Sequence, residues 1–383
     1  MPSRRSEIDP FFVMEVMRAA ERRERAGGDV LHLEVGQPST PATAPVLAAA
    51  HAALDDDRLG YTGATGLPEL REAIAGLYAD RYGLGVDPER VVVTMGASGG
   101  FSLAFLAAFD AGERVAVTAP GYPCYRNVLE AFGVEVVTVE VGPETGFVPT
   151  PEALASHGPL SGVVLASPAN PTGTVLSSSE MAALAAWAAA SGVRLVSDEI
   201  YHGITFGDPA PTALAESDDV IVLQSFSKYW SMTGWRLGWI IAPTDLVRPM
   251  ERLAQNLFIS APTLSQRAAL AAFGGPAIAE ADAHVERYRR NRAVVLDGLA
   301  ALGCRTVAPA DGAFYAYADV SHLGRPSPEL CASWLDEIGV AITPGIDFDP
   351  GRGDRFIRIS FSESTEDVTE AMRRLVAWGQ AGG

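Results

Sequence analysis

The sequence predicts an α/β protein in which a mostly parallel, doubly wound sheet of seven strands is joined to a smaller α+β domain. Three features support this prediction. Between residues 91 and 242, apolar β-branched runs alternate with helical segments, as in parallel sheets whose strands are connected by helices. After Cys304 the expected order changes to strand, strand, helix, strand, strand, helix. A chain of 383 residues with 48% apolar content is long enough for one large domain and a smaller one.

Three helices and a short strand are predicted before the sheet. Apolar residues recur at helical spacing over Phe11–Ala26, and the segment LHLEV then forms a short strand that runs into Gly36. Further helices are expected over Thr43–Asp55 and from Pro68, because proline is favoured in a first helical turn. By residue type alone, Gly36 suits either a turn or close approach to a ligand. Tyr61, in the loop before Pro68, suits either packing or ligand contact.

The large sheet is expected to consist of seven apolar runs: Val91–Met95, Arg114–Thr118, Val134–Val139, Gly162–Ser167, Val193–Ser197, Val220–Gln224 and Leu237–Ala242. The first run leads into a glycine-rich turn, Gly96–Gly100, followed by a helix. Such a turn presents backbone N–H groups to an anion. Asn170 and Asp198 follow two other strands at their carboxyl ends, where open α/β sheets bind ligands. An acid buried there, such as Asp198, needs a positive partner to remain ionised.

A long helical section, Pro262–Leu302, is expected to connect the sheet to the second domain. We therefore expect three parts: an N-terminal segment, residues 1–40, that packs with the small domain; a large domain, residues 41–290; and a small C-terminal domain, residues 291–383.

Composition excludes several classes of function. A formal charge of −18 argues against nucleic-acid and anionic-membrane partners, which require an excess of basic residues on one face. The three cysteines are far apart in the sequence and form no CxxC or Cys/His motif, so neither a disulfide framework nor a metal site is expected. The N-terminal segment lacks the apolar stretch of a signal peptide, and no apolar run reaches the length of a membrane span. These features predict a soluble, cytoplasmic protein.

Lys228 is the only lysine of the chain, since 28 of the 29 lysine and arginine residues are arginine. Where only surface charge matters, arginine can replace lysine. A lysine that persists in such a sequence indicates chemistry that a guanidinium cannot perform, because a primary amine can lose its proton and form a Schiff base with a carbonyl. Ser225 and Arg236 lie close by in the sequence and offer donors to an anion beside this amine.

The segment from Gln224 to Trp239, QSFSKYWSMTGWRLGW, resembles the lysine segment of the class I aminotransferases, which are pyridoxal-phosphate enzymes of fold type I. The resemblance implies that Lys228 binds pyridoxal 5'-phosphate covalently. It also implies that Ser225 and Arg236 bind the phosphate of this cofactor. Further family motifs occur in family order from about Gly36 to Phe361.

These motifs imply roles for the remaining cofactor-binding residues. Gly96, Ala97 and Ser98 would bind the phosphate together with Arg236. Tyr122, which by residue type alone could equally cap the core, would stack on the pyridine ring. Asn170 of NPTG would hydrogen-bond the phenolic oxygen of the cofactor. The DEIY segment would supply two catalytic residues, with Asp198 keeping the ring nitrogen protonated and Tyr201 donating to the phenolic oxygen.

The resemblance also implies how substrate and partner subunit are bound. Gly36 and Asn170 would lie beside the substrate, and Arg358 of FIRISF would bind its α-carboxylate. Tyr61 resembles the tyrosine that reaches the cofactor phosphate of the partner subunit. We therefore expect a homodimer with shared active sites.

The expected activity is transfer of an amino group between an L-amino acid and a 2-oxo acid by a ping-pong mechanism, with Lys228 moving the proton at the α-carbon. Asn256 aligns with the second basic residue of dicarboxylate-specific members. We therefore expect an enzyme that is not restricted to dicarboxylates and that uses glutamate and 2-oxoglutarate as one couple. A lyase or decarboxylase would retain every residue named. A cofactor-binding regulator would need a DNA-binding domain, for which the segment before Gly36 offers no room.

Overall fold

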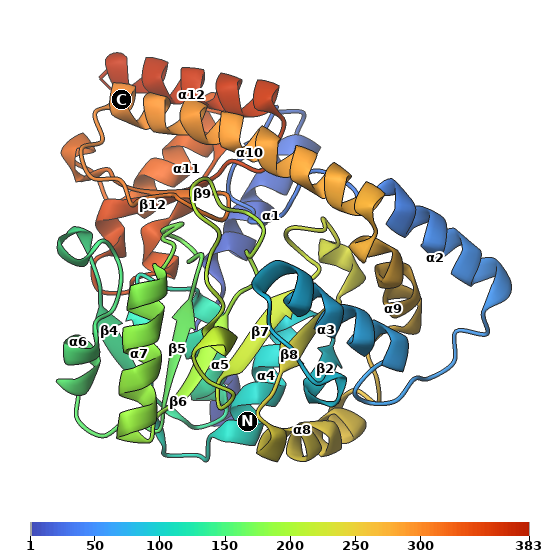
Figure 1. The fold of residues 1–383 in the computed structure, drawn as a ribbon. Helices are drawn as coiled ribbons and strands as arrows, with labels where there is room; N and C mark the ends of the chain where they lie inside the picture. The colour runs from blue at the N-terminus through green and yellow to red at the C-terminus, as the bar shows by residue number, and fades with distance from the viewer. Residues whose placement is uncertain (1, 383) are drawn as a thin grey trace.

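The computed structural model describes residues 2–382, and within this range a seven-stranded sheet forms the centre of the larger domain (Figure 1). In spatial order its strands are β2 (Val91–Thr94), β8 (Gly238–Ile241), β7 (Ile221–Ser225), β6 (Arg194–Asp198), β5 (Gly162–Ala166), β3 (Arg114–Ala119) and β4 (Glu135–Glu140). Strand β8 runs antiparallel to β2 and β7, and the other neighbours are parallel. The predicted fold class is thereby confirmed.

Alternating side chains of the strands enter two separate cores. Val92 faces one core and Val93 the other, because successive side chains of a strand point to opposite faces. The core that contains Val92 is covered by α4 (Gly96–Ala108), α5 (Pro123–Ala131) and α8 (Thr244–Leu257). The opposite core is covered by α2 (Ala44–Asp56), α3 (Pro68–Tyr82), α6 (Pro151–Ala155), α7 (Ser178–Ser191) and α9 (Thr263–Ala269). Burial on both faces explains the apolar runs of β2, β5 and β8, whereas the edge strand β4 has exposed glutamate and threonine side chains.

Two local features differ from the sequence prediction. The turn Gly96–Gly100 was expected to precede a helix, but helix α4 already begins at Gly96. Close packing favours glycine at position 100, since a Cβ atom there would lie 3.2 Å from Leu223. Helix α8 was not predicted, although Leu246, Met250 and Ala254 bury one face of it, because Pro249 interrupts the helical pattern.

The smaller domain contains the antiparallel sheet β11 (Thr343–Pro344), β12 (Phe356–Ser360) and β9 (Tyr315–Asp319). The strand expected directly after Cys304 is reduced to a single bridge between Val307 and Ala318. Helices α10 (Gly275–Leu302) and α12 (Thr365–Gln380) lie side by side over this sheet, with α11 (Ser327–Ile338) beneath them (Figure 1).

The N-terminal segment joins the smaller domain. Strand β1 (Leu31–His32) pairs in parallel with β10 (Val340–Ala341), and α1 (Phe12–Arg25) contacts β10 and β11. The Asp347 carboxylate accepts hydrogen bonds of 3.2 Å from the backbone N–H groups of Phe12 and Val13, at the start of α1. Helix α1 is thus attached to the smaller domain at its first turn.

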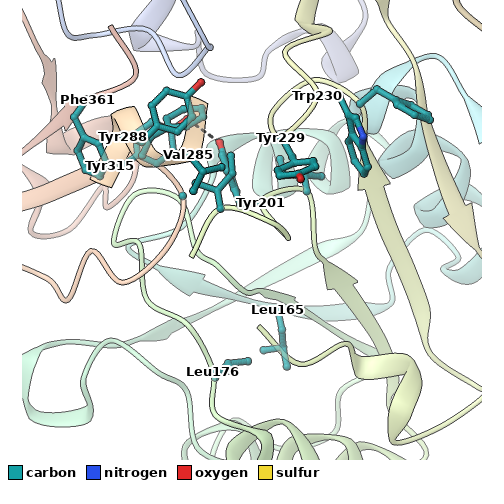
Figure 2. Close-up of a cluster of buried hydrophobic side chains, with 14 of the residues drawn as sticks. Leu165, Leu176, Tyr201, Tyr229, Trp230, Val285, Tyr288, Tyr315 and Phe361 are labelled. Carbon is teal, nitrogen blue, oxygen red and sulfur yellow. Dashed lines mark hydrogen bonds between the residues drawn. The ribbon is translucent and has the colours of Figure 1, made fainter. Parts of the chain in front are cut away.

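Buried aromatic side chains fill the junction between the two domains. Figure 2 shows Tyr201 from the large domain facing Tyr315 of β9. Both rings pack against Phe314, which also contacts Tyr288 of α10. No helix of the described chain combines the length and apolar character that crossing a membrane requires.

Candidate active site

A cavity lies at the carboxyl ends of the central strands, where the large sheet meets α1 and the smaller domain. One part has a volume of about 160 Å³ and a second part about 180 Å³. Both parts are lined by Tyr122, Ile200, Lys228 and Thr233. The two hollows therefore form one site around the only lysine of the chain.

Lys228 follows strand β7, and its Nζ donates a hydrogen bond to the carbonyl oxygen of Gly36. Burial lowers the pKa of Lys228 to about 7, with a further contribution from the positive charge of Arg358, while Asp198 opposes the shift. A large fraction of this amine is consequently unprotonated near neutral pH. Unlike a surface lysine, it can act as a nucleophile or a base.

Asp198 ends strand β6 and is buried with no lysine or arginine within ion-pair distance among residues 2–382. Its carboxylate accepts a hydrogen bond from the Tyr125 hydroxyl and another of 3.1 Å from the Ile200 N–H. Burial raises the pKa of Asp198 to about 6, against the effect of these two donors. A cation bound in the cavity would remove this penalty, so Asp198 fits the protonated ring nitrogen of pyridoxal phosphate.

A group of hydrogen-bond donors suited to an anion lies in the second part of the cavity. It is formed by Ala97 and Ser98 in the first turn of α4, by Ser225 and by Arg236. The Arg236 guanidinium lies against Gly96, where an added Cβ atom would be 2.6 Å from Nη2. A helix N-terminus, hydroxyl groups and a guanidinium are the donors that a phosphate group requires. The five residues predicted to bind the phosphate of their own subunit therefore lie together.

Arg358 of β12 enters the first part of the cavity from the smaller domain. It is 2% exposed, and it donates hydrogen bonds to the Glu34 carbonyl oxygen and, at 3.2 Å, to Asn170 Oδ1. Within residues 2–382 its Nε atom has no partner, and no carboxylate forms an ion pair with it. A buried guanidinium without an anion is costly, so the geometry suits a carboxylate ligand.

Tyr122, Tyr201 and Gly36 complete the set of predicted residues in the cavity. The Tyr201 and Tyr315 hydroxyl oxygens are 2.7 Å apart. A Cβ atom at Gly36 would lie 1.9 Å from the Tyr315 hydroxyl oxygen, which leaves room for no residue except glycine.

Two residues singled out from the sequence lie elsewhere. Tyr61 is 83% exposed and lines neither part of the cavity in the single chain. Asn256 is exposed on α8, where its side chain donates to the Arg252 carbonyl oxygen. Neither residue contacts the site within its own subunit.

Several residues that line or support the cavity are not predicted from the sequence. They are Phe11, Val13, Met14 and Met17 at the start of α1, Val35, Ile200, Thr233, Tyr125 and Tyr315. The helical spacing of apolar residues in α1 indicates a packed face but does not reveal what that face covers. For the described residues, no group of three or more His, Cys, Asp or Glu side chains is placed to hold a metal ion.

Comparison with known proteins agrees with this geometry. The family model for aminotransferase class I and II matches residues 28–375. The valine–pyruvate aminotransferase of Mycobacterium tuberculosis is 53% identical over 377 residues, which are 98% of this chain and 97% of that protein.

Solved structures show the same relationship. An aminotransferase from Mycobacterium tuberculosis has a TM-score of 0.97 at 52% identity, covering 100% of this chain and 99% of that chain. The aspartate aminotransferase of Thermus thermophilus has a TM-score of 0.93 at 32% identity, covering 98% of this chain and 99% of that chain. The chain therefore belongs to the class I and II aminotransferases, whose cofactor is pyridoxal 5'-phosphate.

Proposed function

We propose that this aminotransferase takes its amino group from an L-amino acid with an apolar side chain and transfers it to a small 2-oxo acid such as pyruvate. The observation that carries the proposal is an apolar wall that lines the same part of the cavity as Lys228 and Arg358. Phe11, Val13, Met14 and Met17 contribute to this wall from the N-terminal segment.

The charges in the cavity support an apolar substrate side chain. In the described chain, the cations that line this part of the cavity are Lys228 and Arg358. If Arg358 binds the α-carboxylate, a second substrate carboxylate would face the methionine and phenylalanine side chains of α1. Burying an unpaired carboxylate there is strongly unfavourable. The name of the Mycobacterium tuberculosis relative, with valine and pyruvate, points to the same class of substrates.

The residues of the site suit pyridoxal phosphate as follows. The phosphate would be held by Arg236, Ser225 and the first turn of α4, and the ring by Asp198 and Tyr122. Asn170 and Tyr201 would hydrogen-bond the phenolic oxygen. When bound, the cofactor supplies a carbonyl group that condenses with amines and a ring that withdraws electrons from the substrate α-carbon.

The residues of the chain carry out the other parts of the reaction. Arg358 binds and orients the substrate carboxylate, and the apolar wall excludes water from the α-carbon. Lys228, with its lowered pKa, would take the proton from the α-carbon of the bound substrate, and its Nζ would hold that proton until it is returned. The same site then works in the opposite direction on the second substrate, which gives a ping-pong mechanism.

We further propose that the active unit is a homodimer. Tyr61 and Arg236 are both exposed in the single chain, although the family resemblance assigns both to the cofactor phosphate. Leu257, the last residue of α8, and Ile259, in the loop that follows it, are also about half exposed, at 51% and 49%. A second subunit would cover these apolar side chains and bring its Tyr61 to the phosphate. We also propose the division into residues 1–40, 41–290 and 291–383, in which the N-terminal segment packs with the small domain.

A matrix of amino donors and oxo acceptors tests the substrate assignment. We expect valine, leucine and isoleucine with pyruvate to give kcat/KM values at least tenfold above that of aspartate. The glutamate and 2-oxoglutarate couple predicted from the sequence belongs in the same matrix. We expect it to react more slowly, because its distal carboxylate meets the apolar wall. A higher kcat/KM for aspartate or glutamate than for every apolar donor would contradict the proposal.

A further inference from the structure

We propose that Tyr315 is a positioning residue that connects the carboxylate-binding Arg358 to Tyr201, so that binding of a substrate carboxylate changes how Tyr201 donates to the cofactor. This inference rests on the role of Tyr201 given above. The chain of contacts runs from Arg358 through Tyr315 to Tyr201.

Tyr315 contacts both residues directly. Its ring centre is 4.5 Å from the Arg358 guanidinium carbon, which is the geometry of a cation–π contact. Its hydroxyl oxygen is 2.7 Å from that of Tyr201, a hydrogen bond drawn dashed in Figure 2. The Tyr315 side chain is 1% exposed, so no solvent competes for these contacts.

The hydroxyl of Tyr315 is also fixed in place from a third side. It lies so close to Gly36 that an added Cβ atom would be 1.9 Å away. The Gly36 carbonyl oxygen in turn accepts the hydrogen bond from Lys228 Nζ. Tyr315 therefore has little freedom to turn away from Tyr201.

The proposed role of Tyr201 fixes which hydroxyl donates. From the distance between the two oxygen atoms, either hydroxyl could be the donor. The neighbouring charges do not separate the two groups, because burial raises the pKa of both tyrosines, Arg358 opposes the rise at both and Asp198 adds to it at both. Each tyrosine hydroxyl carries one proton. Since Tyr201 would give its proton to the phenolic oxygen of the cofactor, Tyr315 donates to Tyr201.

This direction leaves the Tyr201 proton available for the cofactor. A hydroxyl that accepts one hydrogen bond donates more strongly in another, because neighbouring hydrogen bonds polarise each other. A substrate carboxylate on Arg358 would neutralise the cation beside the Tyr315 ring and weaken the donation. A carboxylate bound to Arg358 would thereby weaken the hydrogen bond that Tyr201 donates to the phenolic oxygen of the cofactor.

The test is a spectroscopic titration of the holoenzyme. The pH midpoint of the visible absorbance change of bound cofactor is measured with and without isovalerate, a carboxylate that lacks an amino group. Tyr315→Phe should raise the midpoint by about 0.5 to 1 pH unit, the size expected for one hydrogen bond. It should also reduce by at least half the shift that isovalerate causes. Tyr315→Leu lacks the same hydroxyl and should raise the midpoint as well.

Tyr317→Phe is the matched control. Tyr317 lies two residues further along β9, is equally buried, and within residues 2–382 its hydroxyl has no partner. This variant should leave the midpoint unchanged. In a Tyr201→Phe background, Tyr315→Phe should have no further effect, because Tyr315 acts through Tyr201.

The outcomes separate this inference from the proposed function. A midpoint shift in Tyr201→Phe without one in Tyr315→Phe overturns the inference and leaves the role of Tyr201 intact. If neither variant shifts the midpoint, Tyr201 does not contact the cofactor and its assigned role is wrong. An undiminished effect of Tyr315→Phe in the Tyr201→Phe background also overturns the inference.

Discussion

Replacing Asp198 by asparagine should stabilise the cofactor-free protein while it removes the activity. Asparagine has the same shape as aspartate. Its carbonyl oxygen can accept from the Ile200 N–H, and its amide can donate to the Tyr125 hydroxyl oxygen. The substitution therefore removes a buried negative charge and retains both hydrogen-bonding neighbours.

The size of the stability effect follows from the pKa of Asp198. Burial raises this pKa from an ordinary value of 3.8 to about 6. A carboxyl group with a raised pKa contributes stability that is fully present below the unfolded pKa and is lost as the pH rises through the folded pKa. A shift of about two units corresponds to roughly 3 kcal/mol. The asparagine variant should thus be more stable by roughly 3 kcal/mol at pH 7.5 and by well under half of that at pH 4.5.

The activity should change in the opposite direction. Without the charge pair between Asp198 and the ring nitrogen, the transition state would lose roughly 4 kcal/mol of stabilisation at an effective dielectric constant of 20. This loss corresponds to a rate about 1000-fold lower. A residue that lowers stability in the free protein and is needed for the reaction is typical of functional sites.

Urea unfolding of both cofactor-free proteins at pH 4.5 and pH 7.5 measures the difference in free energy of unfolding between Asp198→Asn and the wild type. The protein concentration is held fixed. Asp208→Asn is the control, because Asp208 is an exposed carboxylate. The reasoning is refuted if Asp198→Asn is less stable than the wild type at pH 7.5. It is also refuted if the stability difference is the same at both pH values, or if the variant retains full turnover.

Three further predictions concern other residues of the site. Lys228→Arg should keep the fold and the positive charge but lose turnover and the visible absorbance of covalently bound cofactor; full activity would contradict the role of Lys228. Mixed dimers of Lys228→Ala and Tyr61→Ala chains should recover activity, approaching half the wild-type value per hybrid, because one site combines the intact lysine of one chain with the intact tyrosine of the other. No recovery would show that Tyr61 serves its own subunit. Gly36→Ala should lower the free energy of unfolding in urea by about 1 to 3 kcal/mol, because the alanine Cβ atom would overlap the Tyr315 hydroxyl. Adding Tyr315→Phe to this variant should restore part of the loss.

The sequence alone identifies the chemistry of this protein because the informative residues form short local patterns. Lys228 is the only lysine of the chain, and the segment around it includes Ser225 and Arg236. The apolar runs of the large sheet are equally local, since strands buried on both faces consist mostly of apolar residues. The seven-stranded sheet of the described residues agrees with that pattern, including the strand ends that carry Asp198 and Asn170.

Other features depend on contacts between residues far apart in the chain, which local patterns do not encode. The order of the strands and the pairing of β1 with β10 are examples. The apolar wall on α1 is another, because the spacing of Val13 and Met17 shows that a face is packed but not that it packs over Lys228.

Tyr315 shows the distinction between sequence and tertiary structure most clearly. In the sequence it is one aromatic residue in the segment GAFY, compatible with any buried strand. Only the docking of the smaller domain on the large sheet brings it against Gly36, Arg358 and the Tyr201 hydroxyl. The residues of the sequence determined what chemistry is available. The long-range packing of two domains decided which groups share one cavity, because the energy of that packing comes from surfaces that no single segment contains.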